Sequence, residues 1–273
     1  MTRLPIMAHM IPFFPDLDGS YRVARALADG GARYLEIQFP YSDPTADGPT
    51  IQGAGARALA QGFTVRAGWE FVAALRAGGG GGAAGAGRTG GTAGAQSVEG
   101  AAPGAPIPPI FVMSYAGLVY AYGVDHFVAR AAELGLQGVI VPDLPLDSDE
   151  GLLEAGARHG VHIVPVIALG AAPHRMALVH AAETQYVYAS LRRGITGTHT
   201  EIGAENIAFL EALGARGAKV LAGFGIDSPG QVEAVTAHAH AAVVGSAFVR
   251  AVNEHSDPYP AVRALTEHLV TPR

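Results

Sequence analysis

The stretch that decides the fold runs from Leu35 to Thr50 and reads LEIQFPYSDPTADGPT. Its first residues continue an apolar and aromatic run that is typical of a buried strand. Glu36 lies inside that strand, where a carboxylate without a partner is energetically costly. The strand ends at Pro40 in a polar loop, and Asp47, followed by Gly-Pro, is expected near the N-terminal cap of the next helix.

Two carboxyl groups therefore flank one loop at the end of one strand. Glu36 is expected in an apolar setting, whereas Asp47 is expected on a mobile, polar segment. Environments that differ in this way separate the proton affinities of two carboxyl groups and give a site distinct acid and base roles. The alternatives are a buried glutamate that is satisfied by a structural partner and an aspartate that only caps the helix.

Short apolar runs like this one recur along the chain. They are mostly continuous rather than alternating, as expected of strands that are buried on both faces of a parallel sheet. The eight predicted strands cover Ile6–Phe14, Ala32–Phe39, Ile107–Tyr115, Gln137–Asp143, His162–Ala168, Gln185–Ser190, Lys219–Gly225 and Ala241–Ala247.

Alanine-rich segments with helical spacing lie between these runs. Asp125, Ser228 and Asp257 are candidate helix starts, and Gly30 and Gly160 are candidate stops. Eight strands that alternate with helices in 273 residues predict a (β/α)8 TIM barrel, an α/β fold in a single domain. An open doubly wound sheet is the second possibility, but its first turn would carry GxGxxG, whereas this chain has PDLDG there.

Composition narrows the classes of function. The chain is 49% apolar and 15% charged, and its formal charge of −6 without a basic run argues against nucleic acid as a partner. The absence of cysteine excludes disulfides and thiolate chemistry. No signal sequence or membrane span is expected, so the predicted location is cytoplasmic.

The histidines do not predict a metal site. His238-Ala-His240 is the one compact pair, and it is expected on a solvated surface near the end of a helix. A metal ligand set would instead place several histidines or carboxylates at short, regular spacing.

The segment 78–104 differs from the rest of the chain. Twelve of its 27 residues are glycine, and only Arg88 and Glu99 are charged. Such a segment buries too little apolar surface to offset its ordering entropy, so a disordered insertion is expected. In a barrel it would lie opposite the active site.

Three late strands end in glycine-containing turns, at 190–198, 222–229 and 244–247. Glycine lets bare backbone N–H groups approach a ligand, and helix N-termini add donors and partial positive charge. Each turn alone is better explained as an ordinary tight connection. Because three converge at one barrel end, the sequence favours a phosphate site, to which Arg192 and Arg193 could add charge.

The segment 35–52 closely resembles the signature of the tryptophan synthase α-subunit family, which reads LE-hydrophobic-G-x-PFSDPxADGPxIQ. Other segments are similar to the family in the same order, and the resemblance covers nearly the whole chain except the glycine-rich insertion. These segments are 115–119, 141–145, 192–197, 223–229 and 245–247.

The resemblance implies retro-aldol cleavage of indole-3-glycerol phosphate to indole and glyceraldehyde 3-phosphate. Glu36 would act as the acid and base, and Asp47 would accept the indole N–H. Tyr188 would line the site, and Thr196 would hydrogen-bond Asp47 when its loop closes. The implied phosphate ligands are Gly197, Gly225, Gly245 and Ser246. Neither a metal nor a redox cofactor is required.

The family also implies a partner, the tryptophan synthase β subunit in an α2β2 heterotetramer, which would carry the pyridoxal phosphate. Pro40, Tyr41 and Asp43 resemble the loop that meets this partner. Two residues depart from the family, since Gln38 stands where glycine is usual and Gly117 stands where asparagine is common at the subunit interface.

Two further departures lie near the start of the chain. The loop after the first strand is changed to Pro15-Asp-Leu-Asp, and the helix that plugs the barrel bottom is expected to be short or missing.

Three alternatives stay open. One is a stand-alone lyase that releases free indole, and another is a non-catalytic allosteric subunit that activates a β partner. The third is a different phosphate-binding barrel, such as an epimerase or prenyltransferase. Intact Glu36 and Asp47 argue against the non-catalytic subunit.

Overall fold

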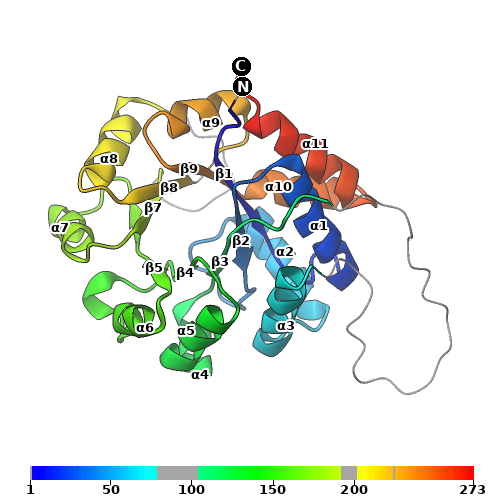
Figure 1. The fold of residues 1–273 in the computed structure, drawn as a ribbon, viewed down its shortest axis with the longest axis horizontal. Helices are drawn as coiled ribbons and strands as arrows, with labels where there is room; N and C mark the ends of the chain where they lie inside the picture. The colour runs from blue at the N-terminus through cyan, green and yellow to red at the C-terminus, as the bar shows by residue number, and fades with distance from the viewer. Residues whose placement is uncertain (1, 79–103, 192–201, 224) are drawn as a thin grey trace.

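A parallel sheet rolled into a barrel forms the centre of the molecule (Figure 1). The computed structural model describes residues 2–78, 104–191, 202–223 and 225–273. The sheet has nine strands in the order β5-β4-β3-β2-β1-β9-β8-β7-β6. They are β1 (Ile6–Met10), β2 (Tyr34–Gln38), β3 (Ile110–Met113), β4 (Gly138–Ile140), β5 (His162–Val164), β6 (Val166–Ala168), β7 (Tyr186–Ser190), β8 (Lys219–Gly223) and β9 (Ala241–Val244).

The fifth predicted strand is divided in two at Pro165. β5 pairs with β4 on one side, whereas β6 pairs with β7 on the other. Proline has no N–H to donate to a strand ladder, but the Pro165 carbonyl accepts from the Tyr188 N–H at 2.9 Å. The backbone through Pro165 therefore joins the two ends of the sheet, and the predicted TIM barrel is confirmed with one strand split.

Helices surround the barrel on its outside (Figure 1). They are α1 (Leu17–Gly30), α2 (Pro49–Ala60), α3 (Val65–Arg76), α4 (Ala116–Tyr122), α5 (Val124–Glu133), α6 (Leu152–His159), α7 (Pro173–Ala181), α8 (Ala204–Gly214), α9 (Pro229–Thr236), α10 (Ser246–Glu254) and α11 (Pro258–Val270).

Most predicted helix signals lie where they were expected. Ser228 and Asp257 are N-caps, and Gly160 ends α6 in the left-handed conformation with φ 70°. Asp125 lies in the first turn of α5 rather than at its cap. Gly30 is the last residue of α1, and the left-handed residue is Gly31, with φ 96°.

Strand residues alternate between two cores. On β2, Leu35 and Ile37 belong to the layer between strands and helices, whereas Tyr34 belongs to the barrel interior, on the same face as Glu36 and Gln38. Both faces are buried, which explains the continuous apolar runs in the sequence.

Aromatic side chains fill the N-terminal end of the barrel. The Tyr34 ring lies 5.6 Å from Phe111, which lies 5.2 Å from Tyr186, measured between ring centroids. Residues 2–5 lead into β1 without a helix. His240 joins the layer, because its Nε2 lies 2.9 Å from the Tyr34 hydroxyl.

The solvated position predicted for His238 and His240 is therefore wrong for His240, which is half-buried against an aromatic ring. His238 lies nearer the surface and pairs with Glu211 at 3.0 Å. Their different partners separate the two histidines, and they do not form a ligand pair.

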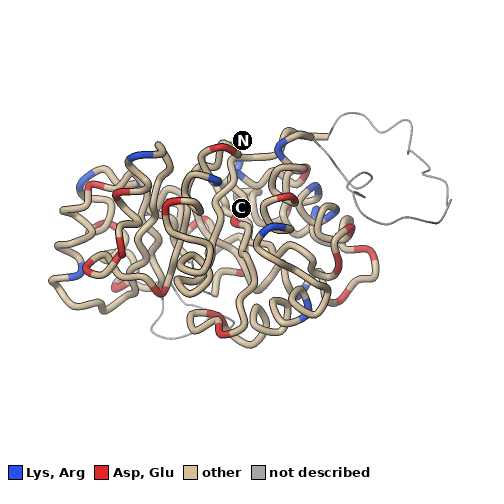
Figure 2. Tube along the Cα trace, turned by 90° about the horizontal axis from the view of Figure 1, so that it is seen from below, with Lys and Arg blue, Asp and Glu red and all other residues tan. Residues whose placement is uncertain are grey.

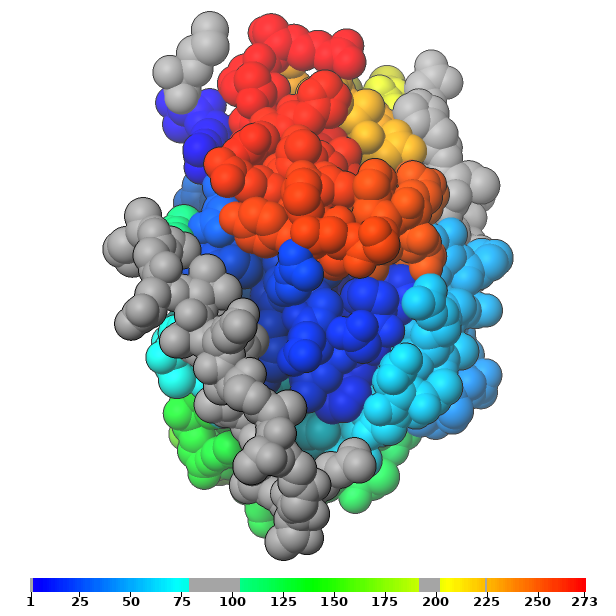
Figure 3. All heavy atoms as spheres, turned by 90° about the vertical axis from the view of Figure 1, so that its right-hand side faces the viewer, coloured from blue at the N-terminus to red at the C-terminus, as the bar shows by residue number. Residues whose placement is uncertain are grey.

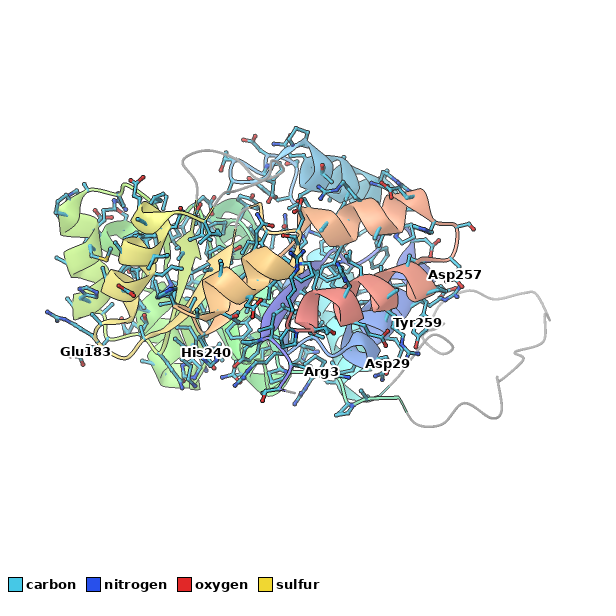
Figure 4. All side chains as sticks on the ribbon, turned by 90° about the horizontal axis from the view of Figure 1, so that it is seen from above. Arg3, Asp29, Glu183, His240, Asp257 and Tyr259 are labelled. Carbon is cyan, nitrogen blue, oxygen red and sulfur yellow. The ribbon has the colours of Figure 1, made fainter. Side chains whose placement is uncertain are left out.

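The first and last helices close the outer ring. α1 and α11 lie side by side in Figure 3, and the Tyr259 hydroxyl donates to Asp29 at 2.8 Å (Figure 4).

Charged residues of both signs are scattered over the described surface without a basic cluster (Figure 2). The predicted insertion 78–104 follows α3 and precedes β3, but residues 79–103 lie outside the described part of the chain.

Gly138 tests the packing of the aromatic layer. A Cβ at this position would lie 2.6 Å from the His162 carbonyl oxygen and 2.9 Å from the Phe111 ring. We expect Gly138→Ala to destabilise the fold by about 1–3 kcal/mol through overpacking, measured by urea unfolding.

Gly53→Ala is the matched control for this change. Gly53 lies on the exposed face of α2, and a Cβ there would meet nothing within 4 Å. Alanine should stabilise this helix by roughly 0.5–1 kcal/mol. Equal effects of the two substitutions would contradict the packing account of Gly138.

Candidate active site

A cavity of about 210 Å³ opens at the C-terminal end of the barrel strands. Such cavities are the usual place for a TIM-barrel site. The predicted site residues that line it are Glu36, Asp47, Tyr188, Gly225, Gly245 and Ser246. Thr196 and Gly197, together with Arg192 and Arg193, lie outside the described residues.

Glu36 points into this cavity from the middle of β2 and is only 4% exposed. Its Oε2 lies 3.0 Å from Nδ1 of His9, the residue beside it on β1. Sequence reasoning missed His9, although a histidine inside an otherwise apolar strand was an available signal. The buried carboxyl group thus has a partner that can share a proton.

Asp47 lies directly before Gly48, the N-cap of α2, as predicted. It is 3% exposed, however, rather than on a mobile, polar segment. Burial raises the pKa of Asp47, while a hydrogen bond from Gln38 and the proximity of His9 oppose that rise. Both predicted carboxyl groups are therefore buried in one cavity.

Gln38 explains how Asp47 is held. Its Nε2 donates to Asp47 Oδ2 at 2.6 Å, and Gln52 Nε2 donates to the Asp47 backbone carbonyl at 2.7 Å. Gln38 lies two residues after Glu36 and so faces the same side of β2. The departure from the family's glycine places an amide donor against the second carboxyl group.

Two tyrosines lie beside the carboxyl groups, Tyr188 in the cavity lining and Tyr115 behind Asp47. Burial and the neighbouring carboxyl groups raise the pKa of both Tyr188 and Tyr115, so both stay protonated as hydroxyl groups near neutral pH. A Cβ at Gly223 would lie 2.6 Å from the Tyr188 hydroxyl oxygen. Glycine at that position therefore leaves room for the hydroxyl near Glu36.

Of the four predicted phosphate residues, Gly225, Gly245 and Ser246 line the cavity, and Gly197 lies outside the described residues. α10 begins at Ser246 with Gly245 as its N-cap, and no side chain caps this end. The first backbone N–H groups of a helix lack partners within the helix, and its dipole attracts an anion. Gly225 has a φ of 79°, a left-handed conformation that glycine adopts without strain. This edge is suited to bind a phosphate.

The three predicted partner-contact residues differ in exposure. Pro40 is buried within this chain, Tyr41 is half-buried and Asp43 is exposed. The Tyr41 ring stacks on Tyr115 with centroids 5.7 Å apart. A Cβ at Gly117 would lie 2.5 Å from the Tyr41 hydroxyl, so glycine at that position makes room for this tyrosine.

The described residues contain no group of three or more histidine, cysteine or acidic side chains that could hold a metal ion. Among the same residues no helix is long and apolar enough to cross a membrane. The cavity offers buried carboxyl groups that can exchange protons with a ligand, and a helix N-terminus that can bind an anion.

Comparisons with known proteins agree on one family. The family model described as "Tryptophan synthase alpha chain" matches residues 3–80 and 96–270. A tryptophan synthase alpha chain from Aliivibrio fischeri is 33% identical over 93% of this chain and 86% of its own length. One from Helicobacter hepaticus is 32% identical over 92% and 86%.

Solved structures agree as well. A structure of Mycobacterium tuberculosis tryptophan synthase has a TM-score of 0.79 at 30% identity, covering 98% of this chain and 91% of that one. A tryptophan synthase complex from Pyrococcus furiosus has a TM-score of 0.78 at 25% identity, covering 98% of both chains.

Tyr41 and Gly117 form a coupled pair that a double-mutant cycle can measure. We expect Gly117→Ala to destabilise the chain because its Cβ meets the Tyr41 hydroxyl, and Tyr41→Phe to remove most of that cost. The coupling energy should be about 0.5–3 kcal/mol in urea unfolding. An equal cost of Gly117→Ala in both backgrounds would show that the two residues are independent.

Asp47 should make stability depend on pH. The pKa of Asp47 in the folded chain is raised above the ordinary 3.8, so the unfolded chain loses this proton at a lower pH than the folded chain does. The free energy of unfolding of the wild type therefore falls as pH rises through the window between the ordinary pKa and the raised folded pKa. Asp47→Asn has no such titration and should be more stable above the window. Unfolding free energies across acidic to neutral pH test this, with exposed Asp43→Asn as control. Parallel curves for Asp47→Asn and wild type would contradict the account.

Proposed function

Because this chain belongs to the tryptophan synthase alpha chain family, we propose that its cavity binds indole-3-glycerol phosphate and that Glu36 and Asp47 carry out its cleavage. The family makes the chain a carbon–carbon lyase of tryptophan biosynthesis. The observation that carries the residue assignment is the burial of both carboxyl groups in one cavity beside a helix N-terminus.

Cleavage requires two proton transfers. Indole C3 gains a proton, the side-chain hydroxyl loses one, and the bond between C3 and the side chain breaks as the new carbonyl forms. Glu36 gives the first proton and accepts the second, so it returns to its starting state. Glyceraldehyde 3-phosphate and indole are the products.

Asp47 acts at the indole nitrogen, whereas Glu36 acts at C3. When C3 is protonated, positive charge develops at the indole nitrogen, and an adjacent carboxylate stabilises it by accepting the N–H. Gln38 supports this role, because its hydrogen bond to Oδ2 favours the charged form of Asp47.

The substrate phosphate lies at the start of α10 in this proposal. Gly245 and Ser246 supply backbone N–H groups, Gly225 lies beside them, and Gly197 joins from the neighbouring loop. Tyr188 lines the indole side near Glu36, and Thr196 hydrogen-bonds Asp47 when that loop closes.

The reaction needs no metal or redox cofactor in this chain. Since a similar solved structure is a tryptophan synthase complex, we propose a β-subunit partner that carries pyridoxal phosphate, in an α2β2 heterotetramer. Tyr41 and Asp43 would contact it, with Pro40 supporting their loop from within. The family match omits 81–95, which supports an insertion at 78–104 in a single barrel domain.

Indole release from indole-3-glycerol phosphate tests the proposal, measured with and without a β subunit. The chain alone should be slow, and the β subunit should stimulate it. Glu36→Gln should lower the rate by about 10²–10⁴-fold, since it removes a group that transfers protons. Glu70→Gln, at a mostly exposed position on α3, is the matched control and should leave the rate unchanged.

Two outcomes would change the assignment. A high rate without the β subunit would identify a stand-alone lyase. Full turnover of the complex by Glu36→Gln would remove Glu36 from the chemistry and favour an allosteric subunit.

A further inference from the structure

The contact between His9 and Glu36 is not required by the cleavage chemistry itself. The two residues are register partners on β1 and β2, so both side chains point into the barrel. Nδ1 and Oε2 lie 3.0 Å apart, and both side chains are almost fully buried. A buried hydrogen bond of this length between a base and an acid orients both groups.

His9 is unusual for its position. The other four residues of β1, which runs from Ile6 to Met10, are apolar and completely or almost completely buried. An apolar side chain would fill this place without the cost of burying an imidazole. A buried imidazole therefore needs a hydrogen-bond partner, and Glu36 is that partner.

The other titratable groups around this pair come from different elements. Asp47 lies on the loop before α2, Tyr188 on β7 and Tyr115 before α4. α10 and α2 contribute uncharged residues to the same wall. Among the described residues that line the cavity, His9 alone has a basic side chain, and its ring N–H is a donor that can face the Glu36 carboxylate.

Building on the proposed function, we infer that His9 is a positioning residue for Glu36. Nδ1–H donates to Oε2, which holds the carboxyl group and leaves Oε1 for the substrate. This hydrogen bond stabilises the carboxylate that remains after Glu36 has protonated indole C3. The same carboxylate then accepts the hydroxyl proton as the carbon–carbon bond breaks, so the protons balance.

The tautomer fits the surroundings. No described residue forms a hydrogen bond to His9 Nε2, which is buried. A proton on Nδ1 leaves Nε2 as an unpaired acceptor, whereas the other tautomer would leave an unpaired N–H donor, the rarer and costlier defect.

Two substitutions separate orientation from packing. His9→Phe keeps a ring but removes the donor, whereas His9→Asn places an amide close to the position of Nδ1. His174→Phe, at an exposed position on α7, is the matched control. Indole release by the complex with a β subunit is measured from about pH 5 to 9, where general acid–base groups determine the rate.

His9→Phe should lower kcat by about 10- to 100-fold, which corresponds to the loss of one hydrogen bond to a charged group. KM should stay nearly unchanged. The acidic limb of its kcat/KM profile should move to higher pH, because the carboxylate loses its N–H donor. His9→Asn should restore most of kcat. His174→Phe should match wild type.

An unchanged rate and pH profile in His9→Phe would overturn the inference. So would a lower rate with an unmoved acidic limb, together with a lower unfolding temperature, because that combination reports packing alone.

The NMR signals of the His9 ring nitrogens at fixed pH, without substrate, test the contact independently of activity. Glu36→Gln should move the Nδ1 resonance, because it changes the acceptor that Nδ1–H faces, and an unchanged resonance would refute the pair. If wild type releases no indole even with a β subunit, the proposed function fails, and the Nδ1 resonance still decides whether His9 and Glu36 interact.

Discussion

The two-residue period of the barrel strands is the constraint on which the site depends. On β2 this period sends Tyr34, Glu36 and Gln38 into the barrel and Leu35 and Ile37 toward the helices. A shift of one residue would put the carboxyl group between strand and helix. The same period brings His9 to Glu36, because neighbouring parallel strands present register partners to the same side.

The interior is divided along the barrel axis. Aromatic rings of Tyr34, Phe111 and Tyr186 fill the N-terminal end, while polar groups line the cavity at the C-terminal end. The packed end holds the strands at a fixed spacing. That spacing fixes the positions of the carboxyl groups at the open end. Stability and chemistry are thereby assigned to opposite ends of the same strands.

Two positions require glycine because a tyrosine hydroxyl lies directly beside them. Gly223 leaves room for the Tyr188 hydroxyl, and Gly117 leaves room for the Tyr41 hydroxyl. Tyr41 in turn stacks on Tyr115, next to Asp47. The loop expected to meet a partner subunit therefore packs on a tyrosine that interacts with Asp47, one of the residues that line the cavity.

The sequence by itself determined the barrel, and it predicted the carboxyl pair and a phosphate site, because apolar runs, caps and turn glycines are local signals. Only the tertiary structure decided that Asp47 is buried, that Gln38 donates to it and that His9 lies against Glu36. It also decided that Pro165 divides the fifth strand and that His240 joins the aromatic layer. The reason is physical, since burial and partners of a side chain depend on strands and loops that meet only when the sheet closes.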